Sequence, residues 1–388
     1  MSKPLIRFLF LGDPRTDRRV KNFIAFFIEQ GYEAELFFAT PGESELGLNI
    51  EGVRIKQLVL DYSGGPRMFL QYARVLQHEL RSSEPCEILF ACELFSLGAA
   101  ATERLNRQAK KLIYDARELY TELPSVANSL FKKWFWKRQE RIGLQKTDLV
   151  IVTAPDDANA IREVHNYLPP SVLVRNLPRR EDYQSNNYLR DYFHISTEKK
   201  VFVYVGGLQE DRGLEKMIDQ MSRLRDDAVF ILIGKGALSD QLLALWRKLD
   251  LDGIVFFHPP IASENVIRIL SSADVGISLI EQHSKSYQLA LPSKVFEYML
   301  AGLPVISSPL KQVKDLFNST AGILFVDPDN SDELLSACRK AMFMSSDIEL
   351  TTKMYVEAYN HFTFESDAAV LKNFLSKYIT SAIPNLHS

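Results

Sequence analysis

Two turns in the second half of the sequence combine glycine with basic residues, as phosphate-binding turns do. The apolar run 201–205 leads into Gly206-Gly207, and Arg212 follows shortly after. Paired glycines let the backbone approach a ligand closely, and a guanidinium can form two parallel hydrogen bonds with a phosphate. The alternative is a tight turn with a solvated arginine. The apolar run 229–233 is followed by a similar turn, which consists of Gly234, Lys235 and Gly236.

The sequence LPSKVFEYMLAGLPVI predicts a short helix that carries polar groups on one face. Pro292 suits the first helical position and Gly302 suits the C-terminal cap. Ser293 and Glu297 are four residues apart and therefore share a face, and Lys294 lies three residues before Glu297. The functional groups of this segment are thus expected at one place.

Glu297 needs a partner, because a carboxylate on so apolar a helix is seldom buried alone. A ribose diol, which donates two hydroxyl hydrogens to one carboxylate, would satisfy it. Lys294 and the amides of the first helical turn would then face the diphosphate of the same ligand. The alternative is an exposed Lys294–Glu297 pair that contributes about 0.5 kcal/mol.

These groups follow short apolar runs that alternate with amphipathic stretches along the whole chain. Such alternation predicts parallel sheets covered by helices on both faces. The predicted strands are 6–11, 35–38, 55–60, 88–90, 111–114, 149–152, 201–205, 230–233, 255–257, 275–280, 304–307 and 322–325. The clearest helical patterns are 19–30, 68–81, 98–108, 132–145, 347–359 and 365–379.

The polar stretch 177–199 lacks a stable period and predicts a linker between two doubly wound α/β domains. We therefore expect an N-terminal Rossmann-like domain and a C-terminal one, followed by a closing helical segment. Ligands of open α/β sheets bind beyond the carboxyl ends of the strands, so a cleft between the two domains is the expected site. The predicted boundaries are 1–176, 177–199, 200–360 and 361–388.

The composition of the chain argues against several classes of protein. With 46 basic and 49 acidic residues among 388, the chain lacks the basic excess of a nucleic-acid-binding protein. Its three cysteines are too few and too scattered for a disulfide framework or a CxxC metal site. The first apolar run is too short for a signal peptide or a membrane span. We expect a two-domain protein of the cytoplasm.

The second half resembles the donor domain of GT-B glycosyltransferases, specifically the retaining group called family 4. The resemblance rests on Gly207 with Arg212, on the Gly234 turn, and on the PSK-x-x-E-Y segment. Residues 256–261 are similar to the strand and loop beside the nucleobase, which would place Ile261 there. The first half resembles the family in its D-x-R-V opening at Asp17 and in the D-A-R-E-L loop, residues 115–119.

Three positions depart from the family pattern. Leu208 stands where an arginine often follows the turn glycine, so Arg212 would carry most of the diphosphate charge. Leu289 replaces the first of two glutamates, whose second member matches Glu297. Arg117 replaces the histidine that usually contacts the transferring sugar, and it would donate to a phosphate or a sugar hydroxyl instead.

The resemblance implies transfer of a hexose-type sugar from a UDP- or GDP-sugar to a glycan or lipid-linked acceptor, with retention of configuration and without a metal. The donor site would comprise Gly207, Arg212, Gly234, Lys235, Ile261, Ser293, Lys294 and Glu297. The residues expected in catalysis are Arg212, Lys294, Glu297, Arg117 and Glu118. Glu118 and Glu93 follow strands of the first half, where acceptor hydroxyls would bind. Two alternatives are a nucleotide-sugar 2-epimerase of the same fold and a catalytically degenerate nucleotide-sugar- or partner-binding protein.

The stretch from Phe131 to Arg141 contains five basic residues and four aromatic ones. A helix of this composition is typical of contact with a membrane surface. The resemblance implies that this surface is the inner face, on which family members that extend lipid-linked glycans lie. The alternative is that Trp134 or Phe135 belongs to the core and that the basic residues form the solvent face of the helix.

Overall fold

The computed structural model describes residues 3–42, 47–123, 126, 128–182, 184–283 and 285–379, the side chain of Lys285 excepted. The chain forms two compact units. The first unit contains the residues up to Arg175 and those from Asp367 onward, and the second unit spans Asn176–Ser366.

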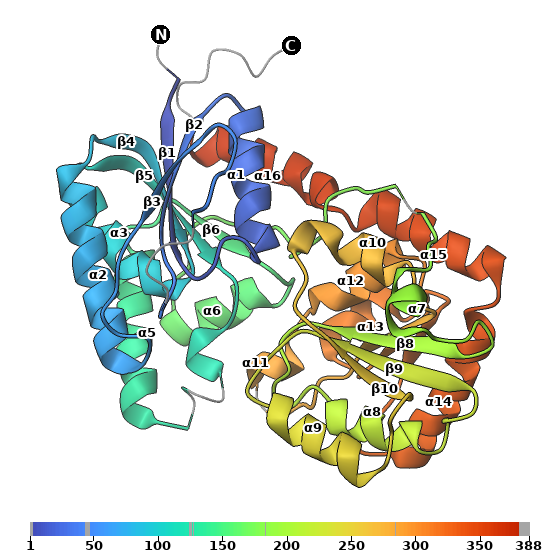
Figure 1. Cartoon of the computed structure of the whole chain (residues 1–388). Coiled ribbons are helices and arrows are strands. Elements are labelled where there is room, and N and C mark those ends of the chain that lie inside the picture. Colours follow the sequence, from blue (N-terminus) through green and yellow to red (C-terminus); the bar gives the residue numbers. More distant parts are fainter. Residues whose placement is uncertain are drawn as a thin grey trace. The chain divides into compact units, whose positions relative to one another are not determined.

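A seven-stranded parallel sheet, in the order β3-β2-β1-β4-β5-β6-β7, forms the centre of the first unit (Figure 1). The strand order reverses between β1 and β4, so the carboxyl ends of these two strands flank the switch point where open sheets bind ligands. Its strands are β1 (Leu5–Leu11), β2 (Glu33–Ala39), β3 (Val53–Gln57), β4 (Cys86–Cys92), β5 (Ala109–Ala116), β6 (Leu149–Val152) and β7 (Ser171–Leu173).

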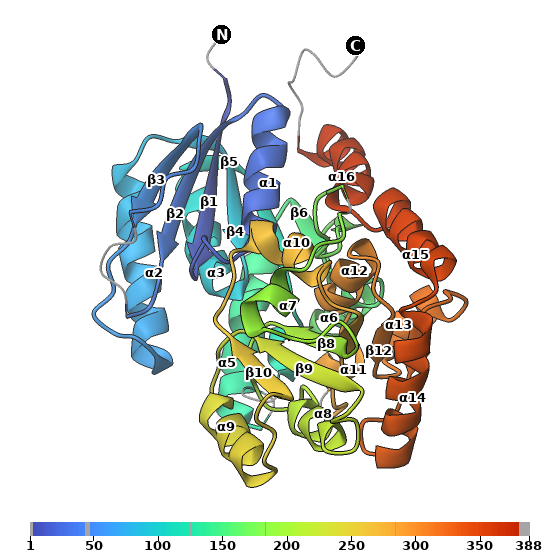
Figure 2. The same cartoon turned by 45° about the vertical axis from the view of Figure 1, so that its right-hand side comes forward.

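Helices cover both faces of this sheet because each has one apolar side. In α1, Phe23 and Phe27 pack against Phe90 of β4 with ring centroids 5.0 and 6.0 Å away. Figures 1 and 2 show α16 beside α1, with α2, α3 and α5 on the opposite face. The helices of this unit are α1 (Arg18–Glu29), α2 (Gly65–Ser82), α3 (Leu94–Leu105), α5 (Leu130–Leu144), α6 (Asp157–His165) and α16 (Phe364–Tyr378), with the 3₁₀ turn η1 (Tyr120–Glu122).

The second unit contains a six-stranded parallel sheet in the order β10-β9-β8-β11-β12-β13. Its strand order reverses between β8 and β11, so this sheet has its own switch point. The strands are β8 (Lys200–Val205), β9 (Ala228–Ile233), β10 (Val255–His258), β11 (Val275–Ser278), β12 (Val305–Ser307) and β13 (Ile323–Phe325).

Two apolar clusters cover the two faces of this second sheet. Helices α8 (Leu214–Met221), α9 (Ser239–Lys248) and α14 (Ser331–Met344) contribute to one cluster. The other cluster contains residues of α7 (Tyr188–Phe193), α10 (Val266–Leu270), α12 (Ser293–Leu300), α13 (Lys311–Phe317) and α15 (Ile348–His361). The short elements η2 (Ser263–Asn265) and α11 (Lys285–Gln288) complete the unit. The α/β class with two doubly wound parallel sheets is therefore confirmed.

The structure differs from the expected linker at 177–199. This segment belongs to the second unit and contains α7, whose Leu189 is buried in the apolar cluster together with Leu177. Most of its residues are polar, so these isolated apolar anchors produce no periodic signal in the sequence. The second boundary also differs, because the division falls at Asp367 rather than near residue 360.

Among the described residues, no helix combines the length and the apolar composition needed to cross a bilayer.

Candidate functional site

The two glycine turns predicted from the sequence lie against each other at the carboxyl edge of the second sheet. A side chain on Gly234 would place its Cβ 2.0 Å from the carbonyl oxygen of Gly206, and one on Gly236 would meet the carbonyl oxygen of Leu208 at 2.1 Å. The amide of Leu208 also donates to the carbonyl oxygen of Lys235 at 3.1 Å. Glycine at 234 and 236 therefore permits packing of backbone against backbone.

Tyr298 attaches helix α12 to this edge. Its buried hydroxyl donates to the carbonyl oxygen of Ile277 at 3.1 Å and accepts from the amide of Val205 at 3.3 Å. Gly276 in β11 leaves room for the ring, since a Cβ there would lie 2.2 Å from it. The N-terminus of α12 is thus held beside the turn that follows β8.

Lys294 and Arg212 place two positive charges at this position. A Cβ on Gly206 would lie 2.9 Å from Nζ of Lys294, so the lysine contacts the glycine turn directly. Burial lowers the pKa of Lys294; Glu297 raises it and Arg212 lowers it. Arg212 lies over the ring of Tyr287, 4.9 Å from its centroid, and its buried Nη1 has no hydrogen-bond partner among the described residues. Two neighbouring cations and an unsatisfied guanidinium nitrogen suit an anionic ligand.

Glu297 is only 8% exposed, so it is not half of an exposed surface pair. It lies one turn from Lys294, in α12, and its charge acts on that lysine. Ser293 is the first residue of the helix and is half-buried, while Pro292 occupies the N-cap instead of the first helical position. Gly302 has the positive φ of +70° that a helix C-terminus favours.

The remaining predicted donor residues lie on adjacent loops. Gly207 is exposed, and its carbonyl oxygen accepts from the Tyr204 hydroxyl at 2.8 Å. Lys235 is exposed at the tip of the turn after β9. Ile261, beyond the end of β10, is half-buried against the cluster that contains α12. This loop is tied to the glycine turns, because the amide of Gly234 donates to the carbonyl oxygen of His258 at 3.1 Å.

The structure accounts for one departure from the family pattern, at Leu208, and shows the surroundings of another, at Leu289. Leu208 is 2% exposed and belongs to the apolar cluster on the α8 face, so packing explains an apolar residue there. Leu289 is half-buried, and its carbonyl oxygen accepts from Nε2 of Gln312 at 2.5 Å. Its backbone thus anchors the loop that precedes α12.

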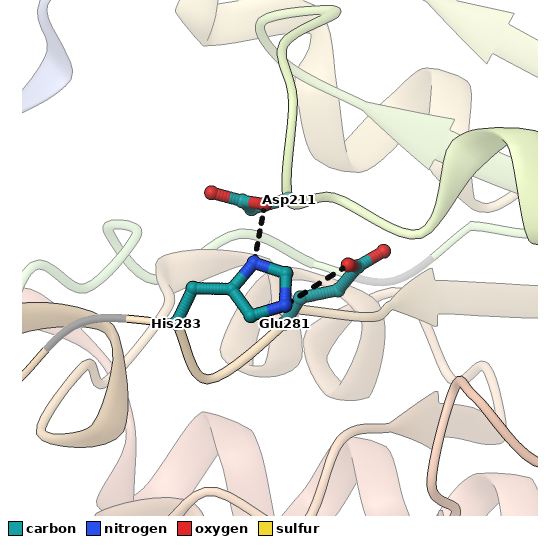
Figure 3. A group of neighbouring side chains, drawn as sticks. All are labelled: Asp211, Glu281 and His283. Carbon is teal, nitrogen blue, oxygen red and sulfur yellow. Dashed lines mark hydrogen bonds and ion pairs between the residues drawn. The ribbon is translucent and has the colours of Figure 1, made fainter. Parts of the chain in front are cut away.

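Next to Arg212, three side chains form a cluster that the sequence analysis missed (Figure 3). Nδ1 of His283 lies 2.8 Å from Asp211, and Nε2 of the same ring lies 3.7 Å from Glu281. The three residues offer ligand atoms within 4.8 Å of one another, as a divalent cation would require. However, Lys216 already places its ammonium 2.7 Å from Glu281. A sequence pattern would not find this cluster, because its members come from two separate loops.

In the first unit, Arg117 lies among carboxylates. Its guanidinium is 2.5 Å from Asp17, 2.9 Å from Asp115 and 3.2 Å from Glu93. Arg19 also contacts Asp115, at 2.6 Å. Arg117 was expected to donate to a phosphate or a sugar hydroxyl; its three ion pairs favour a role in holding these carboxylates in place.

Glu93 and Glu118 differ in their surroundings. Glu118 is exposed, whereas burial raises the pKa of Glu93 to about 7, against the opposing effect of Arg117. Glu93 also has φ of +72° and ψ of 166°, a region that is essentially restricted to glycine. The strained backbone at Glu93 could not be recognised from the sequence.

Two family models match the chain, one in each half. Residues 199–342 match the family described as "Glycosyl transferases group 1", and residues 16–176 match "Glycosyltransferase Family 4". A protein of Escherichia coli strain K12 that is named as a colanic acid biosynthesis glycosyl transferase, WcaI, is 26% identical over 161 residues. The match spans 40% of this chain and only 39% of that relative.

Two solved structures share the fold over almost the whole chain. Sucrose-phosphate synthase from Thermosynechococcus elongatus aligns with a TM-score of 0.77 at 16% identity, covering 97% of this chain and 99% of that one. Anabaena HepE in complex with UDP-glucose aligns with a TM-score of 0.72 at 14% identity, covering 96% and 99%. The two family matches lie in the two units and agree with these folds, and the chain belongs to the GT-B glycosyltransferases of the family 4 type, glycosyl transferases group 1.

Proposed function

We propose that this glycosyltransferase transfers a hexose-type sugar from a UDP- or GDP-sugar to a glycan or lipid-linked acceptor, with retention of the anomeric configuration. The observation that carries the proposal is the pairing of Arg212 and Lys294 beside the glycine turn. Their charges are brought together closely enough for Arg212 to lower the pKa of Lys294, and Nη1 of Arg212 lacks a partner in the described part of the chain. A diphosphate would satisfy both groups.

The other residues that would bind the nucleotide-sugar donor lie at the same edge of the second sheet. Glu297 would accept hydrogen bonds from the ribose hydroxyls. Ile261, Gly234 and Lys235 would border the nucleoside, while Gly207 and Ser293 would offer backbone amides to the diphosphate. The UDP-glucose bound by the structural relative HepE supports a nucleotide-sugar donor.

The proposed chemistry needs positive charge rather than a base from the protein. As the bond between the anomeric carbon and the diphosphate oxygen breaks, negative charge develops on the leaving phosphate. Arg212 and Lys294 would stabilise that charge, and a single preorganised donor of this kind typically contributes about 3 kcal/mol. The acceptor oxygen bonds to the same face of the carbon, and its proton passes to the departing diphosphate. We propose that no metal ion takes part.

We also propose that helix α5 contacts the inner face of a membrane. Its first turns expose Leu130, Phe131 and Trp134, of which Phe131 is 74% exposed and Trp134 60%. The basic side chains of Lys137 and Arg138 are exposed on the same helix. Trp136 instead packs against Phe69 and Phe95, with ring centroids 5.3 and 5.2 Å away. Exposed aromatic residues beside basic ones suit anionic lipid surfaces.

The donor proposal is tested by thermal-shift titration with UDP, GDP, ADP and their sugars. A ligand at about 100 times its Kd should add about 2.7 kcal/mol of stability to the wild type. We expect Lys294→Met, Arg212→Met and Glu297→Gln to lose this shift and to reduce turnover by about 100-fold. Lys248→Met, an exposed lysine of α9, is the matched control and should behave as wild type.

Two outcomes would contradict the donor proposal. A wild type that no nucleotide stabilises would favour the degenerate, partner-binding alternative. Near-normal turnover in the Lys294 variant would show that the diphosphate binds elsewhere. For the membrane contact, co-sedimentation with vesicles that contain phosphatidylglycerol should decrease in a Phe131→Ser, Trp134→Ser variant; unchanged binding would contradict it.

A further inference from the structure

Glu93 holds an unusual position at the end of a central strand. It directly follows β4, at the carboxyl edge of the first sheet, and the strand order reverses between β4 and its neighbour β1. Ligands of open parallel sheets bind beside this switch point. Glu93 is therefore placed where the first unit would receive a ligand of its own.

The backbone of Glu93 is strained. Its φ of +72° and ψ of 166° lie in a region that a residue with a Cβ occupies only at a cost in free energy. Its amide is held by the carbonyl oxygen of Asp115 at 3.2 Å, and its carboxylate by Arg117 at 3.2 Å. A glycine would fit this backbone without strain. Glutamate at this position therefore lowers the stability of the folded protein. Its presence in this strained backbone points to a role for its carboxylate.

The three carboxylates around Arg117 differ in the hydrogen bonds that they accept from the protein. Asp17 caps α1 by accepting from the amide of Val20 at 2.8 Å and also binds Arg117. Asp115 is fully buried, and both Arg19 and Arg117 hold it. Glu93 uses Oε1 for Arg117, while no described residue donates a hydrogen bond to its Oε2. Its side chain is 19% exposed, so part of it can be reached from outside.

We propose that Glu93 binds the attacking hydroxyl group of the acceptor sugar. Oε2 accepts a hydrogen bond from that hydroxyl and orients its oxygen, while Arg117 fixes Oε1. This assignment rests on the proposed sugar transfer and specifies its acceptor side. The acceptor is thus a polyhydroxylated molecule whose nucleophilic hydroxyl reaches the carboxyl edge of the first sheet, next to β4.

Charge balance gives this role a pH dependence. Two guanidinium groups, Arg19 and Arg117, face three carboxylates, so one carboxylate lacks a full counter-charge. Burial raises the pKa of Glu93 to about 7; Arg117 opposes this shift, and nearby carboxylates add to it. Other ionisable groups that interact with Glu93 are Asp17, Asp115, Glu118, Tyr72, Tyr114, Tyr120 and Cys92. Ionised Glu93 is the better acceptor, so transfer should accelerate as the pH rises through about 7.

The first test compares wild type, Glu93→Gln and Glu84→Gln. Glu84 is exposed near the opposite end of β4 and serves as the matched control. Release of UDP from UDP-glucose is measured with octyl β-glucoside, with octyl α-mannoside and with water as acceptors, from pH 5.5 to 8.5. We expect Glu93→Gln to lower kcat by about 10-fold, because a neutral amide oxygen accepts a hydrogen bond more weakly than a carboxylate, and to abolish the rise near pH 7. Its UDP-induced thermal shift should equal that of the wild type.

These readouts separate the two proposals. If UDP still stabilises the variant but turnover and pH profile match the wild type, the role of Glu93 is overturned and the donor site stands. If no nucleotide stabilises the wild type, the proposed function fails and this assignment fails with it.

The second test needs no acceptor. Glu93→Ala removes the carboxylate but keeps the strained Cβ, whereas Glu93→Gly removes both. We expect the glycine variant to melt about 4 °C above the alanine variant. Equal melting temperatures would show that no strain is stored at this position and would overturn the proposal.

Discussion

The ammonium nitrogen of Lys294 lies 5.2 Å from the ring centroid of Tyr204, whose hydroxyl donates to the carbonyl oxygen of Gly207 at 2.8 Å. One aromatic ring therefore contacts both the lysine of α12 and the glycine turn after β8. Burial raises the pKa of Tyr204 to about 12, so the hydroxyl remains protonated and continues to donate. The ring fixes the distance between the turn and the cation that we assign to the diphosphate.

Removing this hydroxyl should loosen the turn without unfolding the unit. We expect Tyr204→Phe to lower the free energy of unfolding by about 1 kcal/mol, the net value of one hydrogen bond, because the ring under Lys294 remains. Affinity for UDP, measured by calorimetry, should fall by about tenfold. Tyr192→Phe, in which the altered ring is 51% exposed, is the control. Identical UDP affinity in the Tyr204 variant and wild type would contradict the supporting role of the hydroxyl.

Because the two glycine turns lie in contact, replacing Gly234 should cause a large loss of stability. A Cβ there would lie 2.0 Å from the carbonyl oxygen of Gly206, and φ is +144°. Gly234→Ala must shift the backbone, so we expect a loss of about 3 kcal/mol in urea unfolding together with loss of nucleotide binding.

Gly253 provides the comparison for this variant. Its φ is +68°, but beyond its chain neighbours no atom of the described residues lies within 4 Å of the place that a Cβ would take. Gly253→Ala should therefore cost about 1 kcal/mol from backbone strain alone. Similar losses at both sites would show that turn-to-turn contact is unimportant.

Glu93 should make the stability of the protein decrease with pH. Its pKa is raised from 4.5 to about 7, so between these values the folded chain holds a proton that the unfolded chain has released. Stability is thus fully present below about pH 4.5 and declines as the pH rises to about 7, by about 3 kcal/mol for this group. Asp157, with its pKa raised by burial to about 6, acts in the same direction.

Urea unfolding of wild type and Glu93→Gln from pH 4.5 to 8 isolates this contribution. The difference between their free energies of unfolding should change by about 3 kcal/mol across the window, because Asp157 affects both proteins equally. Parallel stability curves would mean that Glu93 does not titrate in this range.

Metal removal should leave the enzyme active. The Asp211–Glu281–His283 cluster offers three ligand atoms, but the ammonium of Lys216 already compensates the charge of Glu281. We expect turnover after EDTA treatment to remain within about twofold of its original value, because Arg212 and Lys294 supply the positive charge at the diphosphate. Loss of turnover on EDTA treatment that Mg²⁺ or Zn²⁺ restores in the wild type but not in His283→Ala would refute metal independence.

The regular elements were largely predictable because their signals are local. Each apolar run was found as a strand, and α12 begins and ends within two residues of the Pro292 and Gly302 signals. Helix α7 was not recognised, since Leu189 is a single apolar anchor in a polar segment and six helical residues are too few to show a period. Strand β7 was also missed.

The order of residues along the chain was enough to establish the α/β class, the two sheets and the grouping of Gly207, Arg212, Lys294 and Glu297 after particular strands. Parallel strands carry the residues that follow them to one edge, so local patterns in the right order were sufficient. The surroundings of each charge depend instead on the folded chain. Arg117 binds Asp17, which lies 100 residues away in the sequence, so carboxylates already occupy the guanidinium group of Arg117. Burial and the distances between charges arise from the packing of distant segments, so no local pattern could reveal the raised pKa of Glu93 or the effect of Arg212 on the pKa of Lys294.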